Sequence, residues 1–214
     1  MPRELTDLSF AKWLEPAAAG LEVDREYDCA RFDDVVFTDA DLRNTLFGQC
    51  AFRSVTVAGG VGGGARFTDC WLHGVRFTGT EMPDSAWMDA ELIEGAWSGV
   101  EASGAELRRV VFHGCKLDSV NFRNARLTKV EFVDCVLRHV DFGNAKLSEV
   151  SFPGSEISAL MVRNAQLKKV DFRRAQSIGI AEGVESLRGA LVTPAQVLDL
   201  APTLAAAVGL VVQA

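Results

Sequence analysis

A large apolar residue recurs at every fifth position from Phe32 to Phe172, and this period restricts the possible folds more than any other feature. An amphipathic helix repeats its apolar residues about every 3.6 positions and a half-buried strand at every second one, so neither explains the pattern. Within the series, Gly62 and Ala102 alone are not large and apolar. Two positions before each large residue except Val162 stands a small or β-branched one, such as Cys50. The sequence therefore predicts an internal repeat of five residues.

A second period of twenty residues contains the first. Identical residues recur at this distance, in particular Ala105, Ala125, Ala145 and Ala165, then Val110, Val130, Val150 and Val170. If identical side chains stack on one another, four pentapeptides form one coil with four sides. At a rise of about 4.8 Å per coil, the repeat predicts a rod of roughly seven coils, about 35 Å long. Each coil buries its apolar side chains against its neighbours, so stability is mainly a nearest-neighbour property.

The motif of a small residue, any residue, then Leu or Phe resembles the pentapeptide-repeat family, as in residues 40–44 (ADLRN) and 120–124 (VNFRN). The resemblance covers about two thirds of the chain. It implies an all-β fold, a right-handed quadrilateral β-helix. We expect an N-terminal cap at residues 1–29, the β-helix at residues 30–190 and a further element at residues 191–214. In the cap, Leu8, Phe10, Trp13 and Leu14 are expected to line a short helix or a loose coil.

The C-terminal element reads as a helix. Residues 193–196 (TPAQ) have the form of a capping box with proline at the first helical position. Apolar residues follow at helical spacing, Gly209 is a plausible stop, and Pro202 predicts a kink or two short helices. The apolar residues 191–192 and 210–212 predict short strands. So apolar a helix is expected to pack on the last coil of its own rod or on a second chain.

At the C-terminal end, the resemblance is to one particular group of proteins within the family. Residues 187–190 (LRGA), an apolar strand, an alanine-rich helix and residues 209–212 (GLVV) resemble the tail of the gyrase-interacting quinolone-resistance proteins of this family. In those relatives a C-terminal helix joins two rods end to end, so the resemblance implies a homodimer through residues 191–212. The residues expected at this contact are Val197, Leu200, Ala201, Leu204, Val208 and Leu210.

Charge is distributed unevenly along the chain, whose formal net charge is −7. Residues 65–104 have 2 basic and 7 acidic residues, whereas residues 105–175 have 13 basic and 8 acidic ones. Folding the repeat into four sides places one acidic column, Asp41, Glu81, Glu101 and Asp141, with Asp84 close by. It gathers cations on an adjacent side, diluted by Glu106 and Glu149: Arg108, Arg109, Arg126, Lys129, Lys146, Lys168 and Lys169. A solvated surface explains each of these charges without any partner.

The resemblance gives the acidic column a functional reading. Some family members resemble B-form DNA in width and negative charge and occupy the DNA-binding saddle of DNA gyrase. The sequence therefore predicts a non-enzymatic protein that binds a type II topoisomerase, DNA gyrase above all, by partial DNA mimicry, and modulates it or protects it from quinolone-like toxins. The basic second half departs from that pattern. The alternative is a generic interaction scaffold whose unrelated partner docks at the irregular Gly62–Ala102 region, near the glycine-rich residues 59–64, or at the basic side.

Other functional classes receive no support. The chain has no HExxH, P-loop or GxSxG motif, and residues 60–65 (GVGGGA) lack the strand-to-helix context of a dinucleotide site. The three histidines are placed too far apart to share a metal ion. We therefore expect no catalytic residue, no metal and no cofactor. The acidic net charge argues against a direct nucleic-acid partner, and without an apolar run of about 18 residues no membrane span is expected.

The cysteines are relevant to the cellular compartment, because thiols are oxidised in some compartments and stay reduced in others. Cys50 and Cys70, like Cys115 and Cys135, are one coil apart and within disulfide reach. A chain with no recognisable signal peptide is expected in the cytoplasm, where thiols stay reduced. We therefore expect free thiols that pack as small apolar residues.

Overall fold

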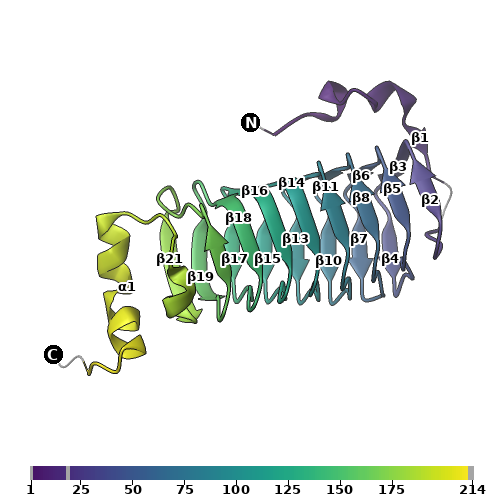
Figure 1. The fold of residues 1–214 in the computed structure, drawn as a ribbon. Coiled ribbons are helices and arrows are strands. Elements are labelled where there is room, and N and C mark those ends of the chain that lie inside the picture. The colour runs from purple at the N-terminus through teal and green to yellow at the C-terminus, as the bar shows by residue number, and fades with distance from the viewer. Residues whose placement is uncertain (1, 18–19, 212–214) are drawn as a thin grey trace.

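The computed structural model describes residues 2–17 and 20–211. It is a parallel β-solenoid of about eight turns with one short C-terminal helix (Figure 1). This confirms the predicted all-β solenoid. The rod has more turns than the seven expected, because regular stacking begins at β2 (Glu26–Asp28), which already pairs with β5 (Leu46–Gly48) and places Tyr27 in the core.

The first two sides of the rod are joined in one large sheet, because long strands turn the corner between them. The first side contains β2, β5, β8 (Arg66–Thr68), β11 (Ala86–Met88), the first parts of β14 (Glu106–His113), β16 (Arg126–Val133) and β18 (Lys146–Ser151), and β20 (Gln166–Lys168). The second side contains β1 (Glu15–Pro16), β3 (Ala30–Asp33), β6 (Ala51–Arg53), β9 (Trp71–His73), β12 (Glu91–Ile93) and the last parts of β14, β16 and β18.

The third side is an eight-stranded parallel sheet. It contains β4 (Val36–Thr38), β7 (Thr56–Ala58), β10 (Arg76–Thr78), β13 (Ala96–Ser98), β15 (Lys116–Asp118), β17 (Val136–Arg138), β19 (Glu156–Met161) and β21 (Ser177–Glu182). The fourth side has single-residue bridges in place of strands, stacked in register from Asp41 to Met161.

The twenty-residue period is the strand register itself. Val110 lies opposite Val130, and Val130 opposite Val150. The side chains two positions further on stack in the same way: the ring centroids of Phe112 and Phe132 are 4.8 Å apart, nearly parallel. Both rings are fully buried. Identical residues recur because each coil presents its neighbour with the same slot.

A column of three asparagines lies at one corner of the rod, where the backbone turns. Asn124, Asn144 and Asn164 have φ angles of 61°, 57° and 57°, in the left-handed region that Asn tolerates better than most residues. The Asn164 Nδ2 group also donates a hydrogen bond to Asn144 Oδ1 at 3.3 Å.

The five-residue repeat continues without an insertion from Phe32 to Phe172, as predicted. The first shift in strand register lies just beyond it, where Ile157 pairs with Ile178.

The N-terminal segment lies along the side of the rod. After the 3-10 helices η1 (Leu5–Asp7) and η2 (Ala11–Trp13), β1 pairs with β3. Leu8 and Phe10 are buried against Ala51, Trp71 and Ile93 of the second side, whereas Trp13 is 62% exposed. The segment therefore covers outward residues of several coils in addition to pairing with the first one (Figure 1).

The C-terminal residues follow the prediction in part. After the 3-10 helix η3 (Val184–Leu187), Thr193 and Gln196 form the reciprocal capping box, and α1 (Pro194–Ala207) is a single helix that contains Pro202. Of the two expected effects of Pro202, the division into two short helices is therefore wrong, and the kink stays a prediction. Leu191 makes an isolated bridge with Asp171, but Leu210 and Val211 form no strand, and Val212 lies outside the described residues. Within the described chain, no helix has the length and apolarity needed to cross a membrane.

The irregular coil keeps its register in spite of its glycines. Val61 bridges the coils on both sides, and a Cβ atom added at Gly62 would lie 3.1 Å from Met82 Cγ, so a neighbouring side chain already occupies that slot. Trp87 and Trp97 are buried with ring centroids 5.4 Å apart. The apolar void between these first coils is about 10 Å³, roughly one water molecule, so no ligand cavity opens there.

Candidate partner-binding surfaces

The predicted acidic column lies on the fourth side of the rod. Successive bridges run from Asp41 through Val61, Glu81, Glu101 and Asn121 to Asp141, so its four carboxylates stand on one straight row. With a rise of about 4.8 Å per coil, Glu81 and Glu101 are about 4.8 Å apart, and the outer carboxylates lie about 10 Å from them. The uncharged Val61 and Asn121 interrupt the row.

Neighbouring side chains neutralise the two ends of the column. Arg43 donates two hydrogen bonds to Asp41, at 2.9 and 2.6 Å, and this lowers the pKa of the Asp41 carboxyl. At the other end Arg123 approaches Asp141 at 3.7 Å. The unneutralised negative charge is therefore concentrated at the middle of the column.

That middle is formed by Glu81, Glu101 and Asp84. Glu81 and Asp84 are exposed, and none of the three enters an ion pair with any described residue. Glu101 accepts hydrogen bonds from Asn121 Nδ2 at 2.6 Å and from the Ser103 amide at 2.9 Å, which fix its carboxylate. Asp84 lies at the adjoining corner, in the left-handed conformation that this corner requires. The structure thus brings the predicted acidic residues to one side and leaves three of the five free to meet a cation.

Helix α1 divides the residues predicted for dimerisation into two groups. Leu200 is 3% exposed and packs on the end of its own rod, where Gln196 Nε2 also donates to the Phe172 carbonyl at 2.8 Å. The other predicted residues face outward on the helix or just after it: Val197, Ala201, Leu204, Val208 and Leu210. Leu198, which the sequence reading omitted, is 75% exposed among them. The helix therefore covers the rod with one face and presents apolar side chains on the other.

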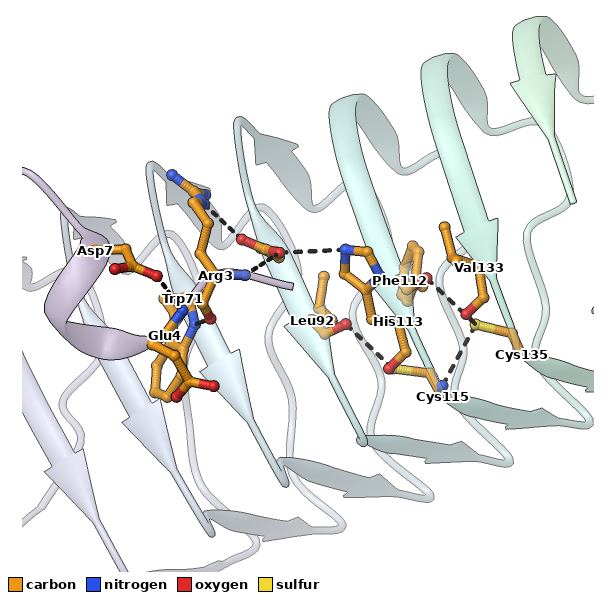
Figure 2. A network of polar contacts seen from close by, with 11 residues as sticks. Arg3, Glu4, Asp7, Trp71, Leu92, Phe112, His113, Cys115, Val133 and Cys135 are labelled. Atoms are coloured by element: carbon orange, nitrogen blue, oxygen red, sulfur yellow. Dashed lines mark hydrogen bonds and ion pairs between the residues drawn. The ribbon is translucent and has the colours of Figure 1, made fainter. Parts of the chain in front are cut away.

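The second side of the rod contains a buried polar cluster that was not predicted from the sequence. Glu91 is 5% exposed and accepts hydrogen bonds from the Arg3 amide at 3.0 Å and from Arg3 Nε at 2.6 Å. His113 Nε2 lies 3.2 Å from the same carboxylate, and Trp71 Nε1 donates to the Arg3 carbonyl at 3.0 Å (Figure 2). His113 is therefore a contact residue of this cluster. The sequence signal was a carboxylate in an outward position next to the apolar Trp71 and Ile93.

The cysteine pairs behave as apolar core residues. All five cysteines are free thiols. The four that stack one coil apart are buried: Cys50, Cys70, Cys115 and Cys135. Cys115 Sγ donates to the Leu92 carbonyl at 3.4 Å, and Cys135 Sγ to the Phe112 carbonyl at 3.4 Å (Figure 2). The hydrogen bond with Cys115 and burial both raise the pKa of the Cys135 thiol. Burial likewise raises the pKa of Cys70. A protonated, enclosed thiol is a poor nucleophile, so Cys70 and Cys135 are expected to be unreactive.

The five-residue register and its side-chain slots agree with a comparison against known families. Residues 105–180 match the model described as "Pentapeptide repeat region". Residues 105–180 are a pentapeptide-repeat region. The matched residues run from β14 into β21. In the coils before them, irregular slots such as Gly62, Met82 and Ala102 depart from the motif.

Several solved pentapeptide-repeat structures are similar to this chain. A trypsin-treated variant of QnrB1, a plasmid-mediated fluoroquinolone resistance protein, is 15% identical with a TM-score of 0.45, over 89% of this chain and 100% of that one. Rfr23 from the cyanobacterium Cyanothece 51142 is 12% identical with a TM-score of 0.39, over 54% and 90%. HetL from the cyanobacterium Nostoc is 18% identical with a TM-score of 0.27, over 79% and 90%.

Likeness at this level carries no argument about function, and the fold rests on the strand register described above. The comparison with curated proteins found no match to this chain.

Proposed function

We propose that this pentapeptide-repeat rod is a non-enzymatic protein-binding module, and that its partner is a type II topoisomerase, DNA gyrase above all, engaged by partial DNA mimicry. The observation that carries the proposal is the row of carboxylates on the fourth side, fixed at coil spacing on a stiff solenoid. A protein groove that binds DNA offers cations in rows, and carboxylates held in a row meet them without reorganisation. The likeness of the C-terminal residues to gyrase-interacting relatives points to the same partner.

The mimicry is partial for a geometric reason. Duplex DNA presents one charge per about 1.7 Å of helix axis, whereas the free carboxylates here are confined to Glu81, Glu101 and the neighbouring Asp84. The contact is therefore centred on two coils in the first half of the rod. Modulation of the enzyme, or protection from a quinolone-like toxin, follows from occupying the site where the enzyme holds DNA.

A supercoiling assay tests this proposal. Micromolar rod should change DNA supercoiling by gyrase, or its inhibition by a fluoroquinolone, and the Glu81→Gln, Glu101→Gln double variant should lose the effect. The control is Asp118→Asn, Glu156→Gln, which removes two exposed carboxylates from the third side. No effect of the rod with or without the drug contradicts a gyrase partner and leaves the scaffold with an unrelated partner.

The homodimer is part of the proposal. The exposed apolar residues of α1, in particular Leu198 and Val208 at 75% and 74% exposure, support an end-to-end contact between two rods. In such a dimer the acidic coils lie at the two tips and the basic coils near the centre. Each tip then presents one acidic column to the enzyme.

A further inference from the structure

We propose that the cations on the first side bind the phosphate backbone of double-stranded DNA. This basic strip consists of Arg108, Arg109, Arg126, Lys129, Lys146, Lys168 and Lys169. The net charge of −7 led us to expect no direct nucleic-acid contact. The charge is segregated, however, and residues 105–175 alone have 13 basic against 8 acidic residues. The basic strip lies in this part of the rod.

Strand register fixes the strip as straight rows. In one row Arg126 lies opposite Lys146, and Lys146 opposite Gln166. In the next outward row Arg108, Thr128, Ser148 and Lys168 follow one another. With about 4.8 Å between coils, the strip extends about 15 Å along the rod. A linear polyanion fits this arrangement better than a single small anion does.

A shallow groove between the two rows has the chemistry of a phosphate site. Its volume is about 200 Å³. Two leucines, Leu147 and Leu167, contribute to its lining, and among the described residues that line it none is a carboxylate. Cations and hydroxyl or amide groups that can donate hydrogen bonds surround it: Arg126, Lys146, Lys168, Thr128, Ser148 and Gln166. Phosphate oxygens accept hydrogen bonds from these groups.

Much of the positive charge in the strip is available to a ligand. Arg109 is paired with Asp89, Arg126 lies 3.7 Å from Glu106, and Lys169 lies 3.9 Å from Glu149. The remaining members have no ion-pair partner among the described residues: Arg108, Lys129, Lys146 and Lys168. Each of them is exposed, so binding a phosphate requires no existing contact to break.

The strip favours a duplex over a single strand. Proteins that hold single strands stack bases on aromatic side chains, and neither the strip nor the described lining of its groove contains an aromatic residue. Only the backbone is read, so binding is independent of base sequence. Since about four free cations are available, the logarithm of affinity should fall against the logarithm of salt with a slope of about −3.6. The acidic remainder of the rod keeps the affinity low.

Fluorescence anisotropy of a labelled duplex of mixed sequence tests the proposal, without any topoisomerase and with salt varied from about 50 to 200 mM. The wild-type rod should bind, and Lys146→Ala and Lys168→Ala should each weaken binding several-fold and reduce the salt slope by about 0.9. Lys116→Ala is the matched control, because that exposed lysine lies in β15 on the third side. Thermal unfolding of each variant shows that the rod stays folded.

Three results overturn the proposal: no binding at the lowest salt, an equal loss in the Lys116→Ala control, or tighter binding of the single strand than of the duplex. Because no topoisomerase is present, failure here leaves the gyrase proposal intact. A normal effect on supercoiling by a rod that fails to bind DNA would separate the two.

Discussion

At the scale of single residues, Glu91 ties the N-terminal segment, residues 2–17, to the side of the rod through Arg3. The column of Glu91 on the second side has Ala51 and Trp71 in the two preceding coils, so a lone carboxylate follows apolar residues. Leu8 and Phe10 cover this apolar surface, and the Arg3 contacts close over Glu91. Removing one partner from a buried, charge-assisted hydrogen bond costs about 1–3 kcal/mol, which is large compared with the few contacts that hold the segment.

The substitution Glu91→Gln should therefore detach the N-terminal segment while the coils stay stacked. The neutral side chain loses the charge that receives Arg3, and its amide group would face the Arg3 donors. Limited proteolysis should cut the variant before Glu15 faster than the wild type, with little change in the unfolding of the rod. Glu94→Gln is the control, because that carboxylate is 73% exposed. Equal protection of Glu91→Gln and wild type would show that the apolar contacts suffice.

Asp89 and Arg109 make a pH-dependent contribution to stability. The hydrogen bond from Arg109 lowers the pKa of Asp89 in the folded rod, and slight burial opposes this. A lowered pKa means that the pair stabilises the rod above the ordinary aspartate pKa, about 3.9, and that this contribution is lost as the pH falls through the folded value. Asp89→Asn should then destabilise the rod slightly at neutral pH and not at acidic pH. Urea unfolding at both pH values measures the difference, and an undiminished effect in acid contradicts the assignment.

At the scale of elements, a coil is stabilised by the coils on either side of it. Phe132 is fully buried, with Phe112 at 4.8 Å and Phe152 at 5.2 Å between ring centroids. Phe37 lies on the edge strand β4, which pairs on one side only, and is partly exposed. The same residue type therefore makes different contributions at the middle and at the end of the rod.

Phe132→Ala should lower the free energy of unfolding by about 3–5 kcal/mol, and Phe37→Ala should lower it clearly less. The cavity left by Phe132→Ala lies between two coils that are themselves held in place, so it cannot collapse. At Phe37→Ala the edge strand can relax toward solvent. Denaturant unfolding monitored by circular dichroism measures both values. Equal losses would contradict a nearest-neighbour account of the rod.

Helix α1 shows what the sequence could and could not predict for an element. The capping box at Thr193 and Gln196 is a local signal, and the structure contains it. The prediction at Pro202 rested on local rules alone, whereas the structure contains one helix through Pro202 whose Leu200 packs on the last coils. Tertiary packing of this kind is not visible in a five-residue pattern.

The exposed face of α1 leads to a prediction about assembly. Leu204→Glu with Val208→Glu places two charges on the outward side and should convert a homodimer into a monomer near 23.2 kDa, without unfolding the rod. Leu200 is unsuitable for this test because it packs within its own chain. Size-exclusion chromatography with light scattering gives the mass. A wild-type chain that is already monomeric would remove the end-to-end dimer from the account.

For the whole molecule, the five-residue period determined the solenoid and the side on which each repeat residue lies, because register converts sequence distance directly into position. The row from Asp41 to Asp141 and the two rows of the basic strip follow from the same arithmetic. Which carboxylates remain unneutralised did not follow, since that depends on side chains such as Arg43 and Arg123. The course of the N-terminal segment did not follow either, because residues outside the repeat have no register.

Competition between the rod and DNA for gyrase is the decisive test of whether the carboxylates of the fourth side replace DNA phosphates in a topoisomerase. Labelled duplex DNA bound to gyrase should be displaced by the rod at a salt concentration where the rod itself no longer binds DNA, and the Glu81→Gln, Glu101→Gln variant should fail to displace it. Rod and DNA bound to gyrase together, or equal displacement by the double variant, would contradict the account.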